Sequence, residues 1–300
     1  MRKWFLSLAV LAVVTVSCAP EEEAPQTTGP TGAEEQTAEE CASTNEADFF
    51  EPGTFTVATG NPAFDPWWSG GTTDDNPDWE FNDPYLLEGY EGAFVSELAG
   101  RLGFSTDDVT FVPIGFNKSF APGPKDFDVV LQQISYSPER AEAVDLSDSY
   151  YDVNQALVSI EDSPFSGVTS IADLADATLG APINTTSLTY IEETIQPTGD
   201  PAVYEDLNGA IRDLKSGQID GIVVDYPTGW FIANVQIDGG VLVGQFPPAG
   251  EQEYFSLALE QGSPLTECVN LAIGELREDG TLDAIKQEWL EQVAAAPVIE

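Results

Sequence analysis

The sequence has no histidine and only ten lysine and arginine residues, against 52 aspartate and glutamate residues, which gives a formal net charge of −42 at pH 7. Without histidine, the chain lacks the commonest general base near neutral pH and the commonest zinc ligand. Such an acidic surface repels DNA, RNA and anionic lipid head groups, so we expect no nucleic-acid partner. The charge suits either a salt-rich medium that screens it or a cation-storing role, and we favour the first.

Sequence motifs of several enzyme classes are also missing. The chain has neither the phosphate-binding loop G-x-x-x-x-G-K-[ST] nor the dinucleotide fingerprint G-x-G-x-x-G. Paired carboxylates can perform acid–base chemistry without histidine, so these absences do not exclude an enzyme. We nevertheless expect a protein that is not an enzyme and needs no cofactor.

The first 18 residues, MRKWFLSLAVLAVVTVSC, indicate export from the cytoplasm. Two basic residues precede an apolar run over 4–16, which is too short for a comfortable membrane span and typical of a secretory signal. Ser17 and Cys18 resemble the lipobox of bacterial lipoproteins, although Thr15 stands where that motif prefers an aliphatic residue. We expect a lipid on Cys18 that anchors the protein outside the cell membrane. An uncleaved anchor would place it on the same side.

The chain has three cysteines. If Cys18 carries a lipid, Cys41 and Cys268 remain as an even pair in an oxidising compartment. We predict a Cys41–Cys268 disulfide between the start of the folded part and its C-terminal region, with two buried thiols as the alternative.

Residues 19–47 are dominated by Glu, Ala, Thr, Pro and Gly, and predict a disordered acidic tether. Beyond it, apolar runs alternate with helical patterns. The predicted strands cover 54–59, 127–135, 155–160, 177–182 and 221–225, and the predicted helices cover 91–103, 206–217 and 281–290. This alternation predicts an α/β fold with parallel sheets.

Polar and aromatic residues follow the ends of the predicted strands, where open α/β sheets bind ligands. These residues are Asn61, Phe64, Ser135, Arg140, Thr185, Thr186 and Asp225. One cation, one anion, hydroxyl groups and an aromatic ring together suit a zwitterion.

Arg140 and Asp225 carry this interpretation. A guanidinium group can grip a carboxylate through two charge-assisted hydrogen bonds of about 1.5–3 kcal/mol each. The alternative for Arg140 is a surface ion pair with Glu139 or Glu142, which would contribute at most about 1 kcal/mol. Asp225 follows four apolar residues, and a carboxylate at a buried strand end needs a partner such as an ammonium group.

The other candidates have simpler alternatives. Thr185 and Thr186 suit a helix N-cap, which is compatible with anion binding at the same helix end. Phe64 could equally be a packing residue. The acidic loop 74–85 lacks the glycine and the glutamate of a calcium-binding loop, so we expect no metal site.

Five segments in order carry a family resemblance. They are PGTFTVATGNPAFDPWW, GYEGAFVSELAGRLGF, FDVVLQQISYSPERAEAVDLSDSYY, LGAPINTTSLTYIEE and LKSGQIDGIVVDYPTGWF. Together they resemble the family 3 extracellular solute-binding proteins, which deliver polar amino acids to ABC importers. The resemblance extends over roughly residues 50–292.

The resemblance implies a type II periplasmic-binding-protein-like fold with two lobes, each a mainly parallel sheet flanked by helices, joined by a two-strand hinge. Lobe 1 would comprise 48–155 and 251–293, lobe 2 would comprise 156–250, and 294–300 would form a tail. The protein would be a monomer that presents its amino acid to an ABC transporter permease.

The resemblance also assigns roles to residues. It implies that Arg140 binds the ligand α-carboxylate and Asp225 the α-ammonium group. The further residues that match family positions are Ser135, Gln133 through its backbone carbonyl, Thr185 and Thr186 through a backbone donor, and the aromatic residues Phe64 and Phe116.

Two positions depart from the family pattern. Asn184 replaces a glycine, and asparagine tolerates the left-handed backbone that such a turn needs. Glu91 replaces an aspartate, a change that we expect to affect the helix start and not the ligand.

Other functions remain open for the same fold. A ligand-sensing module, a secreted cyclohexadienyl-dehydratase-like enzyme, or a partner-binding protein with a vestigial cleft would each share it. The ligand is not specified either, because Lys118 favours an acidic side chain whereas the overall negative field favours a cationic one.

Overall fold

The computed structural model describes residues 36–290 and 296–300, so Cys18 and most of the predicted tether lie outside the described residues. The first lobe contains α1 (Ala38–Thr44), η1 (Glu46–Asp48), β1 (Phe55–Thr59), η2 (Pro84–Leu86), α2 (Tyr90–Arg101), η3 (Thr106–Asp108), β2 (Val109–Pro113), α3 (Phe116–Ser119), β3 (Val129–Ser135), α4 (Pro138–Ala141), β4 (Asp145–Leu146), β5 (Tyr151–Asp152), β11 (Tyr254–Leu259), α8 (Leu265–Glu278) and α9 (Thr281–Leu290). In the described part, no helix combines the length and the apolar character needed to cross a membrane.

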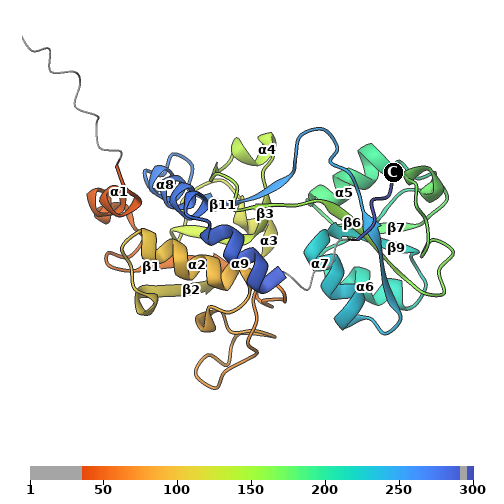
Figure 1. Ribbon diagram of the computed structural model, residues 1–300, viewed down its shortest axis with the longest axis horizontal. Helices are drawn as coiled ribbons and strands as arrows, with labels where there is room; N and C mark the ends of the chain where they lie inside the picture. The colour runs from red at the N-terminus through yellow and green to blue at the C-terminus, as the bar shows by residue number, and fades with distance from the viewer. Residues whose placement is uncertain (1–35, 291–295) are drawn as a thin grey trace, which may run out of the picture. The chain divides into compact units, whose positions relative to one another are not determined.

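The second lobe is built from the middle of the chain (Figure 1). It contains β6 (Gln155–Ile160), η4 (Ile171–Leu174), β7 (Leu179–Pro182), α5 (Thr186–Tyr190), the π-helical turn η5 (Ile191–Ile195), β8 (Ala202–Tyr204), α6 (Leu207–Lys215), β9 (Gly221–Asp225), α7 (Tyr226–Phe231), the π-helical turn η6 (Ile232–Gln236) and β10 (Gly240–Gln245). Each predicted strand and helix forms, with ends that differ by at most two residues from the prediction.

Both sheets are mixed, and in this respect the prediction of mainly parallel sheets is wrong. In lobe 1 the order is β2-β1-β3-β11-β4, with β5 also paired to β11. In lobe 2 the order is β10-β6-β9-β7-β8. The parallel ladders join β1 to β2 and β3, and β7 to β8 and β9. The strands that follow the two lobe crossings, β6 and β11, run antiparallel to their neighbours.

Each lobe has its own apolar core. In lobe 1, α2, α8 and α9 pack together beside the sheet, over buried residues such as Phe55, Phe94 and Leu257 (Figure 1). In lobe 2, separate clusters lie around Leu157 and around Ile222. Separate cores allow the lobes to move as units about the segments that join them.

The chain crosses between the lobes after Asp152 and after Gln245, which gives the two strands of the hinge, and a third time between Leu290 of lobe 1 and Ala296, which contacts lobe 2. The two crossing segments bond to each other: Val153 N donates to the Glu253 carbonyl oxygen at 2.9 Å, and Gln252 Nε2 donates to the Val153 carbonyl oxygen at 2.7 Å. Direct hydrogen bonds between the lobes include that from Trp67 Nε1 to Thr228 Oγ1, at 2.8 Å.

The C-terminal residues 296–300 are not a free tail. Gln245 N donates to the Pro297 carbonyl oxygen and Ile299 N donates to the Gln245 carbonyl oxygen, both at 2.9 Å. Ile299 is 1% exposed and belongs to a core cluster of lobe 2. The edge strand β10 offers unpaired backbone groups to this segment, which is also held by two hydrogen bonds between the backbone of Glu300 and that of residues 169 and 171.

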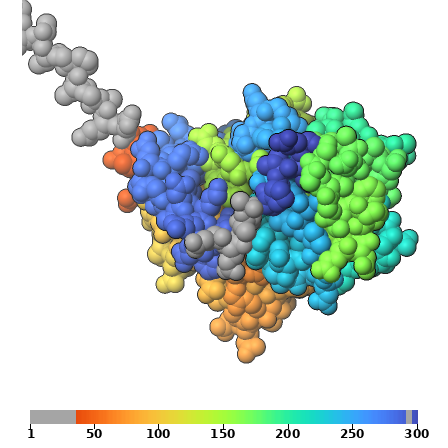
Figure 2. Space-filling view, turned by 45° about the vertical axis from the view of Figure 1, so that its right-hand side comes forward, coloured from red at the N-terminus to blue at the C-terminus, as the bar shows by residue number. Residues whose placement is uncertain are grey.

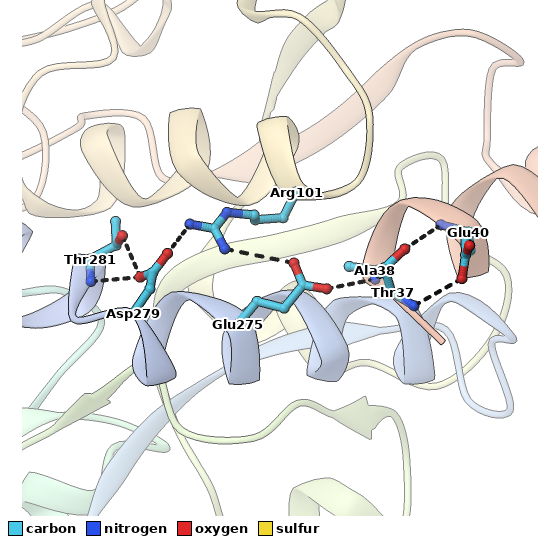
Figure 3. A network of polar contacts seen from close by, with 7 residues as sticks. All are labelled: Thr37, Ala38, Glu40, Arg101, Glu275, Asp279 and Thr281. Carbon is cyan, nitrogen blue, oxygen red and sulfur yellow. Dashed lines mark hydrogen bonds and ion pairs between the residues drawn. The ribbon is translucent and has the colours of Figure 1, made fainter. Parts of the chain in front are cut away.

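The predicted disorder of residues 19–47 is wrong for its last part, because α1 is a capped helix. Thr37 and Glu40 form a reciprocal capping box, and Cys41 forms a disulfide with Cys268 of α8, the pairing that the sequence predicts. Figure 3 shows how the acid Glu275 links this helix to α2, since its carboxylate accepts from Ala38 N at 2.9 Å and pairs with Arg101 at 3.7 Å. The sequence does not predict this helix, because seven residues with only small buried side chains give no clear helical pattern within an acidic segment.

Residues 69–88, which lie between the first two segments that carry the family resemblance, stand out from lobe 1 as an orange segment in Figure 2. The loop is held from within by Asp83, whose carboxylate accepts from Thr73 Oγ1, Asn76 Nδ2 and Tyr85 N. The loop therefore satisfies this buried acid with hydrogen-bond donors from its own residues.

Candidate functional site

A cavity of about 510 Å³ is lined by residues of both lobes. The residues predicted for the ligand site all line it, and they are Asn61, Phe64, Phe116, Gln133, Ser135, Arg140, Thr185, Thr186 and Asp225. They lie at the carboxyl ends of β3 and β9 or in the loops and short helices that follow β1, β2, β3 and β7.

Arg140 lies in α4, which Ser137 caps by accepting from Arg140 N at 3.2 Å. Its guanidinium group is buried and donates to two backbone carbonyl oxygens, that of Ser135 in lobe 1 at 2.6 Å and that of Asn184 in lobe 2 at 2.7 Å. A guanidinium group has five N–H donors, so donors remain for an anion in the cavity.

Aromatic rings cover the same guanidinium group. Its central carbon lies 4.6 Å from the ring centre of Phe120 and 5.6 Å from that of Phe116. Burial lowers the pKa of Arg140 to about 10, while the nearby Glu253 opposes this shift. Among the described residues, Arg140 forms no ion pair, so its buried charge lacks a direct counter-ion.

Asp225 ends β9 and caps α7, where its Oδ1 accepts from Thr228 N at 3.1 Å. Burial raises the pKa of Asp225 to about 6, the hydrogen bonds from Thr228 lower it, and the charge of Glu253 raises it further. No lysine or arginine of the described residues pairs with it. The carboxylate is therefore a half-buried, partly desolvated anion that a cation would stabilise.

Asn184, Thr185 and Thr186 form the entry to α5. Asn184 has the left-handed backbone that the sequence predicts, with φ of 61°. The Thr185 hydroxyl accepts from Leu188 N at 3.2 Å and donates to the Pro182 carbonyl oxygen at 2.7 Å, so it is used as a helix cap. Thr186 instead donates to Glu253 at 2.6 Å.

Gln133 also has a left-handed backbone, with φ of 50°, which is uncommon for a residue with a side chain. Glu91 holds this conformation: its carboxylate accepts from Gln133 N at 3.0 Å, from Gln133 Nε2, and from the Tyr150 hydroxyl at 2.5 Å. Burial raises the pKa of Glu91 to about 7. The expectation that Glu91 affects only the helix start is therefore wrong, because this residue supports a segment that lines the cavity.

Asn61 lines the cavity, but its side chain is engaged elsewhere. Its Nδ2 donates to the Asp78 carbonyl oxygen at 2.8 Å, and its Oδ1 accepts from Glu80 N at 2.9 Å. Phe64 packs against Phe81 of the same loop, with ring centres 5.1 Å apart. Residues 69–88 thus support the lobe 1 wall of the cavity.

Sequence reasoning missed Glu253, which precedes β11 in the return crossing. Its carboxylate accepts from Ser135 Oγ at 2.7 Å, Thr186 Oγ1 at 2.6 Å and Gln155 Nε2 at 2.9 Å. Nothing in the sequence separates this acid from the 51 others. The sequence gives no sign of the role of Gln155 either, because this residue simply begins a mostly apolar strand.

The charged residues that line the cavity divide by lobe. Within the described residues, lobe 1 supplies Lys118 and Arg140, and lobe 2 supplies Glu205, Asp206 and Asp225. In residues 36–290 and 296–300, no group of three or more histidine, cysteine, aspartate or glutamate side chains is placed to hold a metal ion.

Comparison with known proteins gives consistent matches. Residues 69–292 match the bacterial extracellular solute-binding proteins, family 3. The arginine-binding extracellular protein ArtP of Bacillus subtilis (strain 168) is 28% identical over 226 residues, which cover 73% of this chain and 84% of ArtP. The L-cystine-binding protein TcyJ of Escherichia coli (strain K12) is 27% identical over 205 residues, which cover 68% of this chain and 74% of TcyJ.

A solved structure of an ancestral arginine-binding protein bound to arginine has a TM-score of 0.61 and 26% identity, and the match covers 79% of this chain and 98% of that one. These relatives are named as binding proteins. Because the family match extends over most of the folded part, and both the fold and the two-lobed cavity agree with it, the chain belongs to the family 3 bacterial extracellular solute-binding proteins.

Proposed function

We propose that the protein captures a free polar amino acid outside the cell membrane, between its two lobes, and presents it to the permease of an ABC importer. The observation that carries the proposal is that two charged residues of opposite sign, the buried Arg140 and the half-buried Asp225, come from different lobes and line one cavity. Each lacks an ion-pair partner among the described residues. A zwitterion supplies both partners at once.

Arg140 binds the α-carboxylate of this ligand. Its cationic group is desolvated and faces aromatic rings, and its two protein acceptors are neutral carbonyl oxygens. An anion therefore gains strongly from its remaining donors, at about 1.5–3 kcal/mol per charge-assisted bond.

Asp225 binds the α-ammonium group, and we assign the backbone carbonyl of Gln133, a lining residue of lobe 1, as a second acceptor. The raised pKa of Asp225 supports this role, because a cation would replace the solvation that the carboxylate loses by burial. The left-handed Gln133 lies where the ladder between β3 and β11 changes register, so its carbonyl is available outside regular pairing.

The ligand side chain lies among the remaining lining residues, with Phe64 and Phe116 as its aromatic walls. Closure brings lobe 2 over a ligand first held by lobe 1, and contacts made only in the closed state drive the motion. Micromolar affinity corresponds to a binding free energy of about −8 kcal/mol. These hydrogen bonds can supply it even after the entropy lost on ordering the ligand and the lobes is subtracted.

The family is described as extracellular, and an exported, membrane-attached protein fits that description. Attachment through a lipid on Cys18 is part of the proposal, and this residue lies outside the described residues. We infer that the binding protein acts as a monomer and performs no reaction on its ligand.

A thermal-shift screen against the twenty common L-amino acids tests the proposal. At 1 mM ligand we expect one or a few of them to raise the melting temperature by about 5 °C or more, as a dissociation constant near 10 μM requires. The shift should vanish in Arg140→Ala and persist in Arg101→Ala, which removes a lobe 1 arginine outside the cavity. If no amino acid shifts the wild-type protein, amino acid capture is the wrong function.

A further inference from the structure

The carboxylate of Glu253 is where hydrogen bonds from both lobes and the hinge converge. Ser135 Oγ of lobe 1 and Thr186 Oγ1 of lobe 2 both approach its Oε1, at 2.7 and 2.6 Å. Gln155 Nε2, at the start of β6, lies 3.1 Å from Oε1 and 2.9 Å from Oε2. Glu253 does not itself line the cavity, whereas these three partners do.

The direction of each bond follows from the chemistry of the groups. An ionised carboxylate only accepts, and a hydroxyl group has a single proton to donate. The amide of Gln155 is oriented as well, because its Oε1 accepts from Ser187 Oγ at 2.7 Å, which leaves its NH₂ group for Glu253. The two hydroxyl oxygens also lie 3.3 Å from each other, but their shorter distances to Glu253 Oε1, 2.7 and 2.6 Å, assign both protons to Glu253.

These two hydrogen bonds to Glu253 determine whether the hydroxyl groups can act as donors or as acceptors toward a ligand. With their protons taken, the oxygens of Ser135 and Thr186 have only lone pairs left for another partner. A lone pair attracts an ammonium group and repels a carboxylate. Without Glu253, either hydroxyl group could rotate and donate to a ligand carboxylate instead.

We propose that Glu253 is a positioning residue that sets the polarity of the cavity: by accepting the protons of Ser135 and Thr186, it turns both oxygens into acceptors for the ligand α-ammonium group. The inference rests on the proposed function and deepens it. It makes the requirement for a free α-ammonium group a property of Glu253 as well as of Asp225.

The test compares each amino acid that stabilises the wild-type protein with the carboxylic acid in which hydrogen replaces its α-amino group. Calorimetric titrations use wild type, Glu253→Gln, Glu253→Ala and the matched control Glu251→Gln, which neutralises an exposed acid two residues away that does not line the cavity. For Glu253→Ala we expect an about 10- to 100-fold loss of affinity for the amino acid and at most about a threefold loss for the des-amino acid. Glu253→Gln should lie between, and Glu251→Gln should match wild type.

Two results would overturn the inference. Equal losses for both ligands would mean that Glu253 only maintains the structure, and tighter amino acid binding in Glu253→Ala would mean that its carboxylate competes with that of the ligand. A wild-type protein that binds no amino acid would instead reject the proposed function. The hydroxyl assignment would then be decided by neutron diffraction from deuterium-exchanged crystals of the ligand-free protein: deuterons pointing toward Glu253 support it, and deuterons pointing into the cavity refute it.

Discussion

The two lobes bring opposite charges to the cavity that they share. Lobe 1 lines it with the cations Lys118 and Arg140, whereas lobe 2 lines it with the acids Glu205, Asp206 and Asp225. We therefore expect the negative end of a zwitterion to face the lobe 1 cations and its positive end to face the lobe 2 acids, with Gln133 and Ser135 of lobe 1 as further acceptors for the positive end. We therefore expect the orientation of the ligand and the closure of the lobes to have the same electrostatic origin.

The lobes also hold their principal charges differently. Arg140 is fixed by neutral carbonyl oxygens and aromatic rings, including one carbonyl from the opposite lobe. Asp225 is fixed as a helix cap by Thr228 N, within its own lobe. Neither arrangement neutralises the charge that it holds, which leaves both charges to the ligand.

Removing the lobe 1 cation should have the largest effect. In Arg140→Ala we expect amino acid affinity to fall about 1,000-fold, because two charge-assisted bonds of about 2 kcal/mol each are lost. Calorimetric titration measures the change. Arg140→Lys keeps the charge without the planar fork and should recover only part of the affinity. Wild-type affinity in Arg140→Ala would show that lobe 1 binds the ligand by other means.

The disulfide should stabilise lobe 1 and leave lobe 2 unaffected, because Cys41 and Cys268 both lie in lobe 1. Replacing both by serine should lower the free energy of unfolding by about 3 kcal/mol, as measured in urea. Amino acid affinity should stay within about twofold of wild type, since neither cysteine lines the cavity. A large loss of affinity with an unchanged free energy of unfolding would contradict a disulfide that stabilises lobe 1 but takes no part in ligand binding.

Neutralising the lobe 2 anion should cost less than removing the lobe 1 cation. Asp225→Asn retains the helix cap but loses the charge, and we expect an about 30-fold loss of affinity, or about 2 kcal/mol. The matched control is Asp213→Asn, which neutralises a lobe 2 acid outside the cavity. An unchanged affinity in Asp225→Asn would assign the ammonium group to another acceptor.

A change of pH should act on the same anion more mildly. The pKa of Asp225 is raised to about 6 without a ligand, so a proton competes with the ammonium group as the pH falls through this value. We expect about tenfold weaker binding at pH 5 than at pH 7. Glu91, with a pKa of about 7, titrates in the same range, so the profile is also measured in Glu91→Gln. A flat profile in wild type would contradict the role of Asp225.

Much of this site follows from the sequence, because a general rule places ligands at the carboxyl ends of strands. Arg140 and Asp225 come after apolar runs that form β3 and β9. A charge after such a run is conspicuous, and two charges of opposite sign suggest a dipolar ligand. The structure brings both to one cavity.

The remaining parts depend on contacts that leave no local pattern. Glu253 acts through Ser135 and Thr186, which are distant in sequence, and it is one acid among 52. Glu91 marks a helix start by its position, yet its bonds to Gln133 appear only once α2 lies beneath β3. Helix α1 is stabilised by its disulfide and by α8, so a short acidic segment gave no sign of it.

A crystal structure with the amino acid identified in the thermal-shift screen is the most direct test of the central claim. We predict a ligand carboxylate within about 3 Å of the Arg140 guanidinium group and a ligand ammonium nitrogen within about 3 Å of the Asp225 carboxylate. A ligand held by one lobe alone, or bound with its two ends exchanged, would contradict the claim.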